Sequence, residues 1–102
     1  MDTIFINFLN ANKQAKELEE LADRLKKAVT NDFDSAIQSL SADWQSDNAV
    51  AYLRKGNILQ TQMINTANDI LVIASNIRRT ARRIYEAEKK AEELARLRKT
   101  KS

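Results

Sequence analysis

Apolar residues recur along the first half of the chain at alternating steps of mostly three and four positions. The series follows Asn7, whose side chain can cap a helix, and consists of Ala11, Ala15, Leu18, Ala22, Leu25, Val29, Phe33, Ala36 and Leu40. Charged residues fill most of the intervening positions, as they do on the solvated side of a helix. The pattern predicts one amphipathic helix over about residues 7–41.

The helical pattern stops at SADWQSDN, residues 41–48. This stretch is rich in residues that cap helices and form turns, and Ser46 or Asp47 can accept hydrogen bonds from the first N–H groups of a following helix. It contains neither Pro nor Gly, which favours a short connection between antiparallel neighbours. We therefore expect a turn over about residues 42–48.

Two series with a seven-residue spacing run through the second half of the chain. The first consists of Ala49, Gly56, Met63, Ile70, Ile77, Ile84 and Ala91, and the second of Leu53, Gln60, Ala67, Ala74, Ala81, Glu88 and Ala95. Large residues dominate the first series and small ones the second, which predicts a helix over about residues 49–99 with a heptad seam that packs closely on a neighbour. Gly56 costs about 1 kcal/mol in a helix interior, and a close contact would explain it.

The two predicted helices differ in length, at about 50 and 75 Å for 1.5 Å per residue. Folding back at the turn brings Asn7 near Arg82, so the chain beyond Arg82 is expected to project past the hairpin, with Ile84, Tyr85, Leu94 and Leu97. A lone two-helix hairpin also leaves the flanks of its apolar stripes uncovered. The sequence therefore predicts a single all-α domain, residues 1–102: an antiparallel two-helix hairpin with a long second helix, completing a four-helix bundle with a protein partner.

The partner-facing surface is expected in the middle of the second helix, where residues 70–73 are apolar nearly all round the helix. The predicted interface consists of Met63, Ile70, Leu71, Ile73, Ala74, Ile77, Ala81 and Ile84.

Composition limits the chemistry that this chain offers. It has no Cys and no His, so the usual thiolate and imidazole metal ligands and the common nucleophile–base pairs are missing. Neighbouring acids such as Glu19 and Glu20 point in different directions on a helix, and the chain has no glycine-rich phosphate loop. We expect no enzymatic activity, no catalytic residue, no cofactor and no metal site.

The N-terminal sequence MDTIFINFLN begins with an acid and has no small-residue cleavage site, so we expect no cleavable signal peptide. The longest uninterrupted apolar run, residues 70–74, is far shorter than the ~20 residues that span a bilayer. If the protein is exported, it must use another route.

Charge is unevenly distributed along the chain. Residues 78–101 contain ten Arg or Lys and four Glu, a net charge of +6, whereas the remainder has a net charge of −3. The cluster Arg78–Arg83 leaves open a cytosolic basic helical dimer that binds nucleic acid, although the glutamates that follow would repel phosphate. A generic coiled-coil scaffold is the other alternative.

A helical hairpin with its only Trp in the turn resembles the WXG family, the small early-secreted-antigen-like helical proteins of type VII secretion. Trp44-Gln45-Ser46 occupies the place of the family's Trp-x-Gly turn, with Ser46 instead of Gly. The stretches SLSADWQSDNAVAYLRK and IRRTARRIYEAEKKA are also similar to members from Gram-positive bacteria. The family's export motif often reads Tyr-x-x-x-Asp/Glu, whereas Tyr85 is followed four positions later by Lys89, and Glu88 lies one residue short of that register.

The resemblance implies a non-catalytic secretion substrate or toxin targeting factor. Such a protein assembles with itself or with the helical N-terminal region of an LXG-type toxin, and it is cytoplasmic until the type VII machinery secretes it. By the same resemblance, Trp44 and Ser46 are the turn motif, in which the indole packs across the helix junction or is presented to the machinery. Tyr85 and Glu88 are the nearest match to an export signal.

Overall fold

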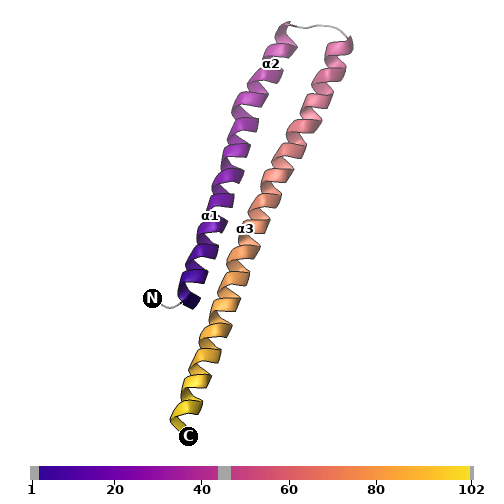
Figure 1. Ribbon diagram of the computed structural model, residues 1–102. Coiled ribbons are helices and arrows are strands. Elements are labelled where there is room, and N and C mark those ends of the chain that lie inside the picture. The colour runs from indigo at the N-terminus through magenta and orange to yellow at the C-terminus, as the bar shows by residue number, and fades with distance from the viewer. Residues whose placement is uncertain (1–2, 44–46, 102) are drawn as a thin grey trace. The chain divides into compact units, whose positions relative to one another are not determined.

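The computed structural model describes residues 3–43 and 47–101, all of which are helical. Helix α1 extends over Thr3–Lys27, the π-helical stretch η1 over Ala28–Phe33, α2 over Asp34–Asp43 and α3 over Asp47–Lys101 (Figure 1). Since α1, η1 and α2 follow one another without a break, this part of the chain has two helical segments, consistent with a helical hairpin. The predicted helices, residues 7–41 and 49–99, lie within the observed bounds.

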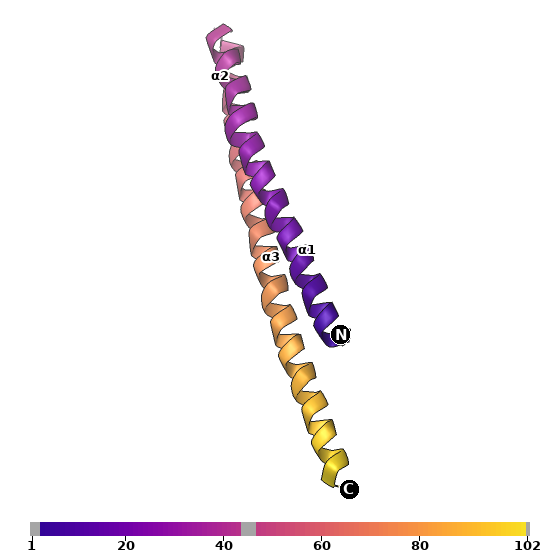
Figure 2. The same ribbon diagram turned by 90° about the vertical axis from the view of Figure 1, so that its left-hand side faces the viewer.

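The chain divides into two compact units, and each unit contains residues from both helical segments. Unit 1 consists of Met1–Glu17 and Val72–Ser102, and unit 2 consists of Leu18–Leu71. Within each unit, the described parts of the two segments run antiparallel and side by side (Figures 1 and 2).

In unit 1, the beginning of α1 packs on the C-terminal half of α3. The ring centroid of Tyr85 lies 4.8 Å from that of Phe8 and 6.2 Å from that of Phe5. The prediction that Tyr85 projects beyond the hairpin is therefore wrong. Helix α1 begins at Thr3, one turn earlier than the predicted start at Asn7, because its phenylalanines are stabilised by packing on the tyrosine ring.

Small side chains form the contact between the segments of each unit. The buried alanines are Ala15 and Ala74 in unit 1, and Ala22, Ala49 and Ala67 in unit 2. Large members of the other heptad series, such as Met63 and Ile77, are only half-buried. The small residues therefore let the helical backbones approach closely, while the large side chains flank the contact and remain partly open to solvent.

The π-helical stretch η1 changes which residues of unit 2 face inward. The backbone N–H of Asp34 donates a hydrogen bond to the carbonyl of Val29, five residues earlier, as π-helical geometry requires. Such a turn is wider than an α-helical one. Phe33 at its end and Ile37 in α2 are half-buried. Leu40, which uniform α-helical spacing places on the buried stripe, is 40% exposed instead.

Gly56 permits a close approach between α2 and α3 in unit 2. A Cβ atom at this position would lie 3.0 Å from Cδ1 of Ile37, and the φ angle of Gly56 is not in the left-handed region. A methyl group at this position would therefore press against the end of the Ile37 side chain, whereas the backbone conformation does not itself require glycine.

Candidate partner-binding surface

An apolar groove with a volume of about 380 Å³ lies between α1 and α3 in unit 1. The residues that line this α1–α3 groove are Ala11, Ile73, Asn76, Ile77, Thr80, Ala81 and Ile84. Ile73 and Ile84 are about half exposed, at 51% and 50%. Four residues of the predicted interface, Ile73, Ile77, Ala81 and Ile84, thus come together at one open apolar surface.

The other four residues of the predicted interface do not line this groove. Ala74 is completely buried within unit 1, so its side chain is not accessible to a partner. Met63, Ile70 and Leu71 are half-buried residues of unit 2. Only part of the predicted surface therefore forms a continuous patch in unit 1.

Sequence reasoning missed a second groove, which lies in unit 2 and has a volume of about 530 Å³. The residues that line this α2–α3 groove are Phe33, Ala36, Ile37, Leu40, Tyr52, Leu53 and Gly56. Leu40 and Tyr52 are exposed large side chains. Two features of the sequence point to this groove. The lone Gly56 allows α2 and α3 to approach closely, and the residues of low helix propensity in η1 favour the wide turn after which Leu40 is exposed.

The two residues of the predicted export signal line the same small cavity of unit 1, which has a volume of about 150 Å³. Tyr85 is half-buried and contacts the rings of Phe5 and Phe8, whereas Glu88 is exposed. Tyr85 therefore has a packing role within unit 1, whatever its role in export.

The predicted turn motif, Trp44 and Ser46, lies outside the described residues. On either side of it, α2 ends at Asp43 and α3 begins at Asp47.

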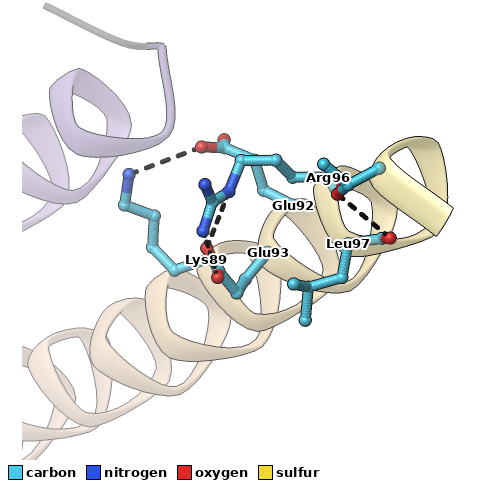
Figure 3. A network of polar contacts seen from close by, with 6 residues as sticks. Lys89, Glu92, Glu93, Arg96 and Leu97 are labelled. Atoms are coloured by element: carbon cyan, nitrogen blue, oxygen red, sulfur yellow. Dashed lines mark hydrogen bonds and ion pairs between the residues drawn. The ribbon is translucent and has the colours of Figure 1, made fainter.

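The basic C-terminal quarter makes several polar contacts within the chain. Nη1 of Arg78 donates a hydrogen bond to Oδ1 of Asn12 at 3.2 Å, and Nη1 of Arg79 donates one to Oδ1 of Asn76 at 3.3 Å. Farther along α3, two exposed ion pairs connect residues three positions apart: Lys89 with Glu92 and Arg96 with Glu93 (Figure 3). The glutamates partly offset the positive charge of this helix, which weakens a nucleic-acid-binding surface here.

Within residues 3–43 and 47–101, no group of three or more His, Cys, Asp or Glu residues is arranged to hold a metal ion. In the same part of the chain, no helix combines the length and apolar character needed to cross a membrane.

Comparisons of this chain with protein-family models, curated proteins and solved structures yield no match.

Proposed function

We propose that this protein is a non-catalytic, WXG-like helical hairpin that binds a helical protein partner and is exported with it by a type VII secretion system. The partner is a second copy of the chain or the helical N-terminal region of an LXG-type toxin, and the partner's helices complete a four-helix bundle.

The exposed α1–α3 groove is the observation that carries this proposal. The side chains of Ile73 and Ile84 are about half exposed to water. A partner that covers them would stabilise the complex by about 25 cal/mol for each Å² of apolar surface removed from water. The groove lies between two antiparallel helices, and a third helix that packs into such a groove extends the pair toward a bundle. Grouped exposed apolar side chains are typical of interaction sites.

The sequence features of type VII substrates support the choice of export route. Trp44 and Ser46 stand between the two helical segments, and Tyr85 and Glu88 line one cavity near the beginning of α1. We assign Trp44 and Ser46 to the turn motif, and Tyr85 and Glu88 to the export signal.

Binding through the α1–α3 groove is tested by the change Ile73→Asp, with Val72→Asp as a matched control. Both isoleucine and valine are more than half exposed in the same turn of α3, but only Ile73 lines the groove. We expect Ile73→Asp to weaken assembly about tenfold or more, which corresponds to about 1.4 kcal/mol, because a charge would be buried against apolar groups. The mass of the assembly, with or without a co-expressed LXG-type region, is measured by light scattering; equal effects of the two changes would refute this use of the groove.

Export is tested by measuring the chain in culture supernatants of a producing strain and of the same strain without its type VII ATPase. We expect the chain in the first supernatant only. Equal amounts in both would contradict the export route and favour a scaffold that acts inside the cell.

Nucleic-acid binding, the alternative function, is tested by titrating duplex DNA into the purified chain at low and at physiological salt. Tight binding that weakens steeply with salt would favour this alternative over the partner-binding function.

A further inference from the structure

The end of α3 has an apolar face of its own. Residues 90–100 are all exposed, and Leu94 and Leu97, at 47% and 46% exposure, are the large apolar side chains among them. Residues three positions apart lie on the same side of a helix. The two leucines therefore form one short apolar ridge, which we call the α3 ridge.

The α2–α3 groove has the form that such a ridge requires. It is an open apolar depression of about 530 Å³, and the exposed side chains of Leu40 and Tyr52 are among those that line it. Apolar ridges of helices commonly bind in grooves of this kind, with anchor residues three or four positions apart.

The charges around the two surfaces are complementary. Residues 89–101 contain six Arg or Lys and two Glu, a net charge of +4. Both of these glutamates form ion pairs with basic residues of the same helix (Figure 3). Residues 29–57, which contain the groove, have four Asp and two Arg or Lys, a net charge of −2. Opposite net charges favour the encounter of the two surfaces.

We propose that the partner is a second copy of this chain, and that the α3 ridge of each copy binds in the α2–α3 groove of the other. Each chain carries both complementary surfaces, so a two-fold axis satisfies two ridges and two grooves at once, as in an isologous dimer. This inference rests on the proposed function, since it names the partner of the same assembling hairpin. It places a contact at the α2–α3 groove in addition to the α1–α3 groove.

Leu94→Asp and its neighbour Ala95→Asp test the ridge in the full-length chain. Both positions are exposed, but Ala95 is rotated by about 100° from Leu94 around the helix axis. We expect the wild-type chain to form a dimer of about 23 kDa, twice its 11.6 kDa. Light scattering over a concentration series should show a dimer dissociation constant at least tenfold higher for Leu94→Asp and within twofold of wild type for Ala95→Asp. Circular dichroism checks that both variants remain helical.

Cross-linking identifies the groove that receives the ridge. The chain has no cysteine, so a Leu97→Cys variant can be mixed with a Leu40→Cys variant under mild oxidation. We expect a disulfide-linked pair of the two variants in much greater yield than from Ala95→Cys mixed with Leu40→Cys. Equal yields would overturn the assignment of the ridge to this groove, and a wild-type chain that stays monomeric at every concentration would overturn the choice of a second copy.

The two proposals fail in distinguishable ways. If Ile73→Asp abolishes export while Leu94→Asp leaves export and assembly unchanged, the ridge-and-groove dimer is refuted and the partner-binding function stands. If the dimer forms and cross-links as expected but export does not depend on the type VII ATPase, the secretion function is refuted and the dimer stands.

Discussion

Replacing Tyr85 with alanine should destabilise the hairpin, because this ring joins α3 to the beginning of α1 within unit 1. The side chain contacts the rings of Phe5 and Phe8, at centroid distances of 6.2 and 4.8 Å. Two aromatic contacts of this kind contribute about 1–3 kcal/mol together beyond area burial. The loss of a half-buried apolar ring adds about 1 kcal/mol, so Tyr85→Ala should lower the free energy of unfolding by about 2–4 kcal/mol.

Urea denaturation followed by circular dichroism measures this change. Tyr85→Phe is the matched control, because it keeps both ring contacts and removes only the hydroxyl group, and it should stay within about 0.5 kcal/mol of wild type. All variants are compared at one protein concentration, since assembly would add to the apparent stability.

A double-mutant cycle measures how much of this stabilisation comes from the contact between Tyr85 and Phe8. Tyr85→Ala and Phe8→Ala, made separately and together, should show a coupling energy of about 0.5–1.5 kcal/mol. Additive effects, or a loss of less than about 0.5 kcal/mol for Tyr85→Ala alone, would refute the packing role of the tyrosine. If Tyr85→Phe keeps its stability but loses export, the hydroxyl group is needed for recognition and not for packing.

Three other substitutions probe the close contacts and the exposed charges. Gly56→Ala should raise the unfolding free energy by about 0.5 kcal/mol in urea denaturation, since the gain of about 1 kcal/mol in helix propensity is reduced by contact with Ile37. The full gain should return when Ile37 is also replaced with alanine. A large loss of stability with Ile37 and without it would contradict this explanation. Ala74→Leu should lower the free energy of unfolding, measured in a thermal melt, by about 1–3 kcal/mol because it overpacks a fully buried site. Ala87→Leu, at an exposed site, should leave the free energy of unfolding almost unchanged. Equal effects of the two changes would argue against the close alanine contact. Glu93→Gln should change the unfolding free energy by less than about 0.5 kcal/mol, because its ion pair is exposed; a larger loss would indicate that the pair belongs to a folded contact.

The helical class and the approximate helix bounds could be predicted because they follow from local patterns. Side chains three, four or seven positions apart share a helix face, so the periodicity alone marked Ala67 and Ala74 as members of one small-residue series. The absence of Pro from the chain allowed long helices. The polar stretch at residues 41–48 marked where one helical segment gives way to the next. These features need no knowledge of a distant contact.

The candidate site could be predicted only in part. Ile73, Ile77 and Ile84, which were predicted for one interface, line the α1–α3 groove, but Ala74, predicted for the same interface, is buried within unit 1. Two heptad series run along α3, and the periodicity is the same for both. Which series contacts the other segment of the hairpin, and which stays partly exposed to solvent, depends on how closely the two backbones pack.

Contacts between residues far apart in the chain account for the remaining differences. Helix α1 starts at Thr3 rather than Asn7 where Phe5 and Phe8 pack on Tyr85, and the α2–α3 groove forms where the wide turn of η1 leaves Leu40 exposed. Neither feature can be recognised from the spacing of apolar residues within its own segment. Local patterns therefore specified two amphipathic helical segments, whereas the packing of one segment on the other specified which apolar side chains stay exposed to solvent.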